Sequence, residues 1–261
     1  MNQWSRTRRR NALLIVLAFL VVVIAVPLYF FFQVTPTCFD NKQNGDETGV
    51  DCGGSCTTLC GSESLPIISK GDPRVLQVAS STYEAVAYVQ NPNATGMIVR
   101  ASYVFKLYEA SSTVPVKTIT NSVYVPKNAT FAVFEGPFDM GDKKPVRATF
   151  TWDTSTLNWV KDASASPDIA VTDAHITQAS STPRADATIE NRSLADFSNI
   201  YLVSLVFDNT GTIAAASKTY VDTLGAGESA PVSFIWPEPF SFAPASIQII
   251  PTVLPDSSYI R

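Results

Sequence analysis

Side chains able to bind a metal ion or form cross-links are concentrated in one short segment, residues 38–60. All four cysteines of the chain lie there: Cys38, Cys52, Cys56 and Cys60. Carboxylate and amide side chains between the first two cysteines include Asp40, Asn44, Glu47 and Asp51. Oxygen ligands brought together by a short loop are what Ca²⁺ requires. The segment therefore predicts a calcium site at these four residues.

Two alternatives to calcium remain open for this segment. Four closely spaced cysteines in an oxidising compartment most simply form two disulfides, with three possible pairings. The acidic residues are then a solvated loop held by cross-links, each of which typically contributes ~2–4 kcal/mol. Four cysteine thiolates can instead bind zinc tetrahedrally. An oxidising compartment and the acidic residues both weigh against zinc.

The spacing resembles a segment found in many bacterial surface and secreted proteins. The matching positions are Cys38, Asp40, Asn44, Glu47, Asp51, Cys52, Gly53, Gly54 and Cys56. The chain departs from that pattern at its end, where three residues instead of two separate Cys56 from Cys60. The resemblance implies a bacterial surface protein and says nothing specific about activity.

An uncharged apolar run precedes the cysteine segment. Residues 12–32 contain no charged side chain, and about 20 apolar residues suffice for a helix to cross ~30 Å of hydrocarbon. The sequence predicts a transmembrane helix over residues 12–33. The basic residues before it are Arg6, Arg8, Arg9 and Arg10. The positive-inside rule then places residues 1–11 in the cytoplasm and the rest outside, extracellular or periplasmic.

A cleaved secretory signal is the alternative interpretation of this run. The run is longer than the apolar core of a signal peptide, and no small-x-small cleavage site follows it. The bulky residues 30–33 stand where a signal peptidase requires small side chains. We therefore expect an uncleaved signal anchor and a single-pass protein of the cell membrane.

The remainder of the chain is acidic and rich in strand-forming residues. From residue 34 onward it carries 15 Lys and Arg against 23 Asp and Glu, a net charge of −8. That balance argues against nucleic acid as a partner. Runs with an apolar period near two, separated by turn signals such as residues 91–93 and 208–211, predict short antiparallel strands.

An internal repeat of about 100 residues runs through this β-rich part. Asn91 aligns with Asn191, Tyr103 with Tyr201 and Phe134 with Trp236, at offsets of 100, 98 and 102. A repeat this long indicates two copies of one domain. We assign the copies to residues 63–163 and 167–261, after a cysteine-rich module at residues 34–62.

The repeated pattern resembles the FxLYD-type bacterial β-sandwich domain, a relative of immunoglobulin-like folds. The residues that carry the likeness in the first copy are Phe105, Leu107 and Tyr108, with Glu109 in place of Asp. Those in the second copy are Val203, Leu205 and Val206, with Asp208 one residue beyond the acidic position. The resemblance implies an all-β chain with two tandem immunoglobulin-like antiparallel sandwiches, and it implies fold rather than function.

The sequence favours a protein without catalytic activity. His175 is the only histidine, and neither a Gly-x-Ser-x-Gly motif nor a phosphate-binding glycine loop is present. We expect a membrane-anchored extracellular binding, adhesion or structural protein with protein partners at the cell surface. A subunit of an envelope secretion or pilus-like assembly is the alternative.

Overall fold

The computed structural model describes residues 3–32 and 37–255, which form two compact units, residues 1–55 and 56–261. Parts of four predicted segments lie outside the described residues. They are residues 1–2 of the stub, 33 of the membrane span, 34–36 of the cysteine-rich module and 256–261 of the second sandwich.

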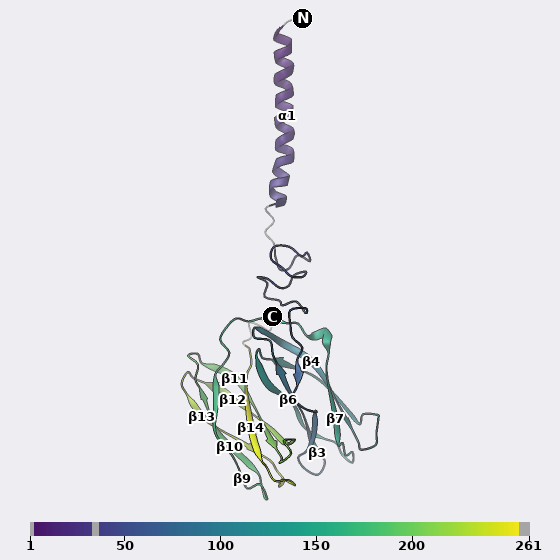
Figure 1. Ribbon diagram of the computed structural model, residues 1–261, viewed down its shortest axis with the longest axis vertical. Coiled ribbons are helices and arrows are strands. Elements are labelled where there is room, and N and C mark those ends of the chain that lie inside the picture. The colour runs from purple at the N-terminus through teal and green to yellow at the C-terminus, as the bar shows by residue number, and fades with distance from the viewer. Residues whose placement is uncertain (1–2, 33–36, 256–261) are drawn as a thin grey trace. The chain divides into compact units, whose positions relative to one another are not determined.

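The first unit contains one long helix, α1 (Gln3–Phe32), which corresponds to about 45 Å at 1.5 Å per residue (Figure 1). Its segment Arg8–Tyr29 has a mean hydropathy of 3.0 and is long and apolar enough to cross a membrane. A secretory signal sequence meets the same criteria. The predicted N-terminal apolar helix is therefore confirmed, whereas its orientation stays a prediction.

The second unit is built from β-strands and one short 3₁₀ helix, η1 (Thr154–Thr156). The strands are β1 (Ile68–Ser69), β2 (Arg74–Gln77), β3 (Thr82–Asn91), β4 (Gly96–Tyr108), β5 (Lys117–Val125), β6 (Ala129–Asp139), β7 (Arg147–Trp152), β8 (Val160–Lys161), β9 (Ile169–Thr177), β10 (Arg184–Asn191), β11 (Phe197–Phe207), β12 (Ile213–Leu224), β13 (Ser229–Ile235) and β14 (Ser246–Val253).

These strands form four antiparallel sheets, two for each copy of the repeat. In the first copy, β3 pairs with β1, β2 and β6, and β4 pairs with β5, β7 and β8. In the second copy, β10 pairs with β9 and β13, and β11 pairs with β12 and β14. We call the β3 and β11 sheets the inner sheets and the β4 and β10 sheets the outer sheets. The predicted all-β fold class, with antiparallel sandwich-like sheets after an apolar helix, is confirmed.

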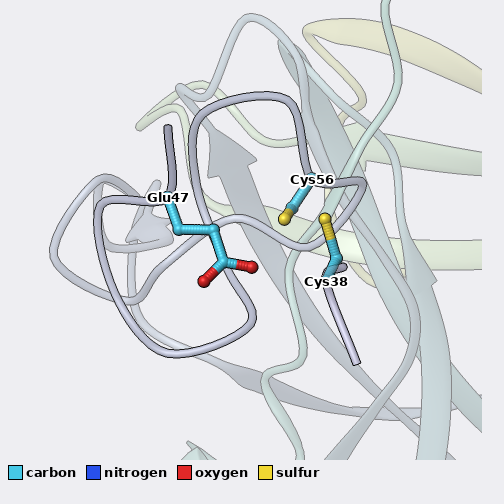
Figure 2. A group of neighbouring side chains, drawn as sticks. All are labelled: Cys38, Glu47 and Cys56. Carbon is cyan, nitrogen blue, oxygen red and sulfur yellow. The ribbon is translucent and has the colours of Figure 1, made fainter. Parts of the chain in front are cut away.

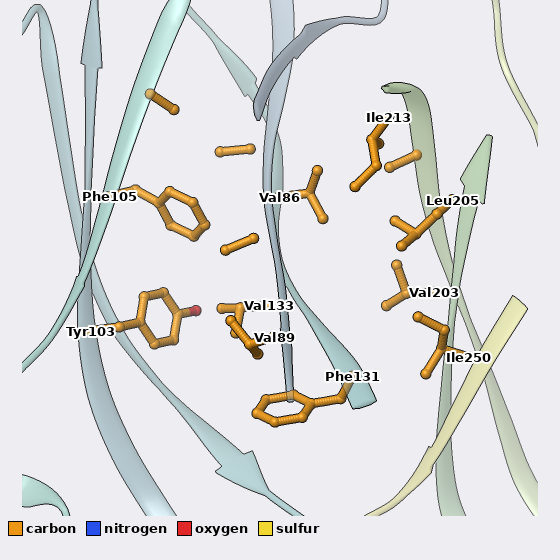
Figure 3. Close-up of a cluster of buried hydrophobic side chains, with 14 of the residues drawn as sticks. Val86, Val89, Tyr103, Phe105, Phe131, Val133, Val203, Leu205, Ile213 and Ile250 are labelled. Carbon is orange, nitrogen blue, oxygen red and sulfur yellow. The ribbon is translucent and has the colours of Figure 1, made fainter. Parts of the chain in front are cut away.

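The two inner sheets pack against each other through apolar side chains. Figure 3 shows Tyr103 and Phe105 on one side of the strand that carries Val86, with Val203 and Leu205 on the other side. All five belong to one buried cluster. The β3 sheet is therefore covered on both faces, and the second unit is a stack of four layers.

Strand β11 is likewise buried on both faces. Val203 and Leu205 join the first cluster, whereas Leu202 and Val206 belong to a second cluster with Phe234 of β13. Side chains alternate between the faces of a strand, so one set packs inside the second sandwich and the other packs on the first. The two sandwiches thus share a continuous apolar interior. The predicted domain boundary at residues 163–167 stays a prediction.

The structure corrects the alignment of Tyr103 with Tyr201, which is the second match of the repeat. The residues that point into the first sandwich from β4 are Tyr103, Phe105 and Leu107. Their counterparts inside the second sandwich are Leu202, Ser204 and Val206, so the offset from 103 to 202 is 99 rather than 98. A slip of one residue exchanges the two faces of a strand. With the corrected offset, Asp208 takes the position equivalent to Glu109.

The alignment of Phe134 with Trp236, which is the third match of the repeat, is also displaced. Ala85 pairs with Glu135, and Ala185 pairs with Phe234, which gives an offset of 99 rather than 102 between β6 and β13. Trp236 lies beyond the end of β13, where its indole Nε1 donates to the carbonyl of Ala216 at 2.8 Å. The resemblance of the two aromatic-Pro-Phe segments therefore does not reflect equivalent positions.

The first match holds, because a buried asparagine ends an equivalent strand in each copy. Asn91 is fully buried, and its Nδ2 donates to the carbonyls of Gly96 and Pro126 at 2.7 and 2.8 Å. Its Oδ1 accepts the backbone N–H of Asn93 at 3.0 Å. The Asn91 side chain thus provides hydrogen-bond donors to the carbonyl at the start of β4 and to the carbonyl just after the end of β5.

Asn191 makes the same contacts in the second copy. Its Nδ2 lies 2.8 Å from the carbonyl of Ala195 and 3.1 Å from those of Leu224 and Gly225. Its Oδ1 accepts the N–H of Ser193 at 3.0 Å. A buried carbonyl left without a donor costs roughly 1–3 kcal/mol. By donating to these carbonyls, the Asn191 side chain stabilises the strand ends of the second sandwich.

Among the described residues, a single carboxyl group is buried, and it lies between the inner sheets. Glu84 is 6% exposed and lies across from Leu76 of β2, on the face of β3 that carries Val86. Its Oε2 has no hydrogen-bond partner among the residues that the structure describes. Burial raises the pKa of Glu84 to about 8. The folded protein therefore favours the protonated form at neutral pH.

Replacing Asn191 with Leu should lower the free energy of unfolding by roughly 2–4 kcal/mol, because one buried and two part-buried hydrogen bonds to carbonyls lose their shared donor. Urea denaturation of the full chain measures this change. Asn209→Leu is the matched control, since Asn209 is exposed in the turn after β11. Equal effects of the two substitutions would contradict the proposed role of Asn191.

Glu84→Gln should remove a pH dependence of stability between about pH 5 and pH 8. The unfolded carboxyl ionises near 4.5 and the folded one near 8. The folded state therefore binds more protons in this window, and stability falls as pH rises, by about 1.4 kcal/mol per unit. Thermal melts across the window measure the slope. The exposed Glu238→Gln variant should keep the wild-type slope.

Candidate functional site

The predicted calcium ligands lie in a loop organised by carboxylate hydrogen bonds. Asp51 accepts the backbone N–H groups of Asp40 and Asn41, each at 2.9 Å. Asp40 in turn accepts the N–H of Lys42 at 3.0 Å and the Nδ2 of Asn44 at 2.8 Å. Asn41 and Asp51 have φ values of 58° and 54°, a left-handed conformation that Asn and Asp tolerate better than most residues. These carboxylates fix the turns of the loop.

Asn44 connects the remaining predicted ligand to this loop. Its backbone N–H donates to Glu47 Oε2 at 3.1 Å. Its side-chain Oδ1 is buried and lacks a hydrogen-bond partner within the described part of the chain. The structure thus links Asp40, Asn44, Glu47 and Asp51 in one hydrogen-bonded loop. An amide oxygen without a donor is an available ligand for a cation.

The carboxylates themselves do not converge into one cluster. Among the described residues, no group of three or more close metal-ligand side chains contains Asp40 or Asp51. Glu47 does belong to such a group, in which its carboxylate lies within 4.8 Å of the Cys38 sulfur (Figure 2). A complete calcium site would require the carboxylates to exchange some backbone partners for the ion.

The cysteine prediction is confirmed in its main point. Cys38, Cys52, Cys56 and Cys60 are all disulfide-bonded, and none is free. Figure 2 shows the side chains of Cys38 and Cys56. Zinc binds cysteine as the thiolate, and a disulfide sulfur offers none. The zinc alternative therefore loses its ligands in this oxidised chain.

The only histidine lies on the polar face of the second outer sheet. Asp186 of β10 pairs across β9 with His175 and across β13 with Ser233. The Ser233 hydroxyl donates to Asp186 Oδ1 at 2.6 Å, and Arg184 Nε donates to the same carboxylate at 2.8 Å. These bonds, that of Arg184 first, lower the pKa of Asp186 to about 2.

This order of side chains differs from that of a nucleophile and its base. Asp186 lies between Ser233 and His175, so the serine hydroxyl is bonded to the carboxylate instead of the imidazole. His175 Nδ1 lies 2.7 Å from the carbonyl of Asp173. The sequence does not reveal this pairing, because sheet register, not chain spacing, brings Asp186 and Ser233 together.

A groove of about 730 Å³ opens beside the first sandwich. It is lined by consecutive residues of β5 and of β6, and by the end of the second inner sheet, including Tyr201 and Lys218. The Lys218 Nζ lies 4.9 Å from the centroid of the Tyr201 ring. Such a mixture of aromatic and polar lining in a concave site is typical of ligand-binding surfaces. No motif in the sequence indicated this groove.

The polar centre of the groove is a hydrogen-bonded carboxylate. Glu135 of β6 accepts from the Tyr103 hydroxyl and from Asn121 Nδ2, the latter at 2.9 Å. Burial, followed by the bond to Glu135, raises the pKa of Tyr103. Asn121 and Glu135 thereby connect β5 and β6, which belong to different sheets, across the open side of the sandwich.

Comparisons with known proteins give no family. No protein-family model matches the chain, and no curated protein matches it. Among solved structures, it is similar to the crystal structure of red sea bream transglutaminase, at 8% identity and a TM-score of 0.23. The match covers 75% of this chain and 32% of that structure, so the chain spans about a third of its length. A likeness this weak carries no argument about fold or activity.

Proposed function

We propose that this chain is a membrane-anchored binding protein that holds its β-sheets outside the cytoplasm. The observation that carries the proposal is an apolar helix with none of its span Arg8–Tyr29 buried, in a chain whose β-rich unit offers a groove of about 730 Å³. Exposed apolar surface of this extent requires a membrane or an equivalent apolar environment.

The orientation follows from charge and oxidation state. Arg8, Arg9 and Arg10 lie at the start of the apolar span, whereas the chain from residue 34 carries a net charge of −8. The positive-inside rule favours a cytoplasmic N-terminus. Disulfides persist in oxidising compartments, which agrees with an extracellular or periplasmic position for residues 38–60.

The role favoured for the sheets is adhesion or structural binding rather than catalysis. Glu135 and Asp186 are engaged in hydrogen bonds to other strands, Glu135 with Asn121 of β5 and Asp186 with Ser233 of β13. Such bonds stabilise a surface instead of leaving a group poised to move a proton. The resemblance to bacterial surface segments supports a position at the cell surface.

A subunit of an envelope secretion or pilus-like assembly is the second candidate. The unpaired edges of β5 and β6 favour it, because a fixed partner subunit could cover them. Crosslinking in the native membrane followed by mass spectrometry distinguishes the two. One partner at constant stoichiometry favours the assembly subunit, and several substoichiometric partners favour the binding protein.

We further propose that the acidic loop binds Ca²⁺ through Asn44 Oδ1 with oxygens of Asp40, Glu47 and Asp51. The buried amide oxygen without a donor supports this assignment. The bonds that the carboxylates already make support the alternative, in which they only stabilise turns of a disulfide-held loop.

Impermeant maleimide should label the variant Asn209→Cys in intact cells or spheroplasts and should label Ser5→Cys only after lysis. Native cysteines do not compete because all four are disulfide-bonded. N-terminal sequencing of the membrane-bound protein is the companion measurement. Labelling of Ser5→Cys before lysis would reverse the orientation, and a mature N-terminus near residue 34 would show a cleaved signal.

Millimolar Ca²⁺ should raise the melting temperature of the full chain and release or absorb heat in calorimetry, because a ligand of the folded state stabilises it. Asn44→Leu should lose both effects, since it removes the unpaired oxygen, whereas the exposed Asn209→Leu should retain them. If the wild-type chain gives neither effect, the carboxylates serve as turn acceptors and the calcium assignment is wrong.

A further inference from the structure

Strands β5 and β6 are edge strands of the two sheets of the first sandwich. In the described part of the chain, β5 pairs with β4 alone and β6 pairs with β3 alone. An unpaired edge presents a row of backbone N–H and C=O groups that can pair with another chain. These two edges lie on the same side of the sandwich, because both line the groove.

The lining of the groove shows that it runs along these edges instead of over a sheet face. Four successive residues of β5, numbers 121–124, contribute to it, as do Phe131, Ala132, Phe134, Glu135 and Gly136 of β6. Successive side chains point to opposite faces of a strand. Because residues from both faces of β5 and of β6 line the groove, the groove lies against the edges of these strands.

The two walls of the groove carry basic residues. Arg100 lies on β4 of the first outer sheet, and Lys218 lies on β12 of the second inner sheet. Both are exposed, and neither takes part in an ion pair among the described residues. Strand β6 belongs to the sheet between these two walls. Glu135 of the same groove already accepts hydrogen bonds from Tyr103 and Asn121. The two cations, which have no carboxylate partner among the described residues, favour an anionic partner.

We propose that the groove binds an extended peptide carrying acidic side chains, which adds as a strand to the free edge of β6. The inference deepens the proposed binding function by naming the class of partner. Backbone hydrogen bonds to β6 supply affinity, and the walls supply specificity. Alternate side chains of the added strand point to opposite walls. Acidic residues at positions of opposite parity then face Arg100 and Lys218.

Strand β6 suits this role better than β5. An added strand on β6 lies in the middle layer, where both walls flank it, whereas β5 belongs to the outer sheet and has Lys218 on one side only. The edge also distinguishes a peptide from an anionic polysaccharide. A sugar chain can meet the two cations but cannot continue the alternating N–H and C=O pattern of a sheet.

The test is selection of a displayed library of random octapeptides on the full-length protein in nanodiscs, followed by fluorescence anisotropy with the enriched synthetic peptides. We expect enrichment of strand-forming sequences with acidic residues at positions of opposite parity. Arg100→Glu and Lys218→Glu should each weaken binding at least ten-fold. Arg147→Glu is the matched control, since Arg147 is exposed on β7, away from the groove, and should leave affinity unchanged.

Methylation of alternate backbone nitrogens of the selected peptide tests strand addition separately from charge. One alternate set should abolish binding and the other should not, because only one edge of the peptide faces β6. No enrichment, equal effects of the two sets, or binding of heparin without any peptide overturns the proposal. Maleimide labelling tests the membrane topology independently of peptide binding. A failure of the peptide experiment therefore does not contradict the proposed membrane anchor.

Discussion

The two inner sheets bury their facing side chains against each other, and this contact determines what most other surfaces of the β-rich unit can do. Because β3 and β11 are covered on both faces, the sandwiches behave as neighbouring layers with a shared apolar interior. Apolar burial stabilises by about 25 cal/mol per Å². The contact also explains why Glu84, which lies within it, is forced toward its neutral form.

The stack contains the two copies of the repeat, and its outer faces offer no apolar surface for a third copy among the described residues. Outward-facing positions on the first outer sheet are largely polar: Ser102, Lys106, Thr118, Thr120, Thr149 and Thr151. On the second outer sheet, Arg184, Asp186 and Ser233 form a hydrogen-bonded surface. Repeats that stack through apolar faces require polar terminal faces to stay soluble. The two outer sheets meet that requirement, which leaves strand edges as the surfaces suited to partners.

The groove follows from the same arrangement. The first inner sheet ends at β6, so the face of the second inner sheet near Tyr201 and Lys218 helps to form a wall beside that edge. Glu135 and Asn121 bridge the open side of the sandwich without closing it. The apolar helix, the disulfide-bonded loop and the stacked sheets are compatible with the anchor, cross-linked module and binding surface of the proposed surface protein.

The sequence by itself determined the elements whose signal is local: the uncharged run of the helix, the four oxidised cysteines, the alternating strands and the asparagines Asn91 and Asn191. Hydrophobic length, cysteine spacing and the alternation of apolar and polar residues are properties of short segments. It misplaced the repeat along β11, because a strand buried on both faces has no polar side to fix its register. Tertiary structure decided that register, the burial of Glu84, the bond between Asp186 and Ser233, and the groove. Each depends on residues far apart in the chain, which only the pairing and stacking of sheets bring together.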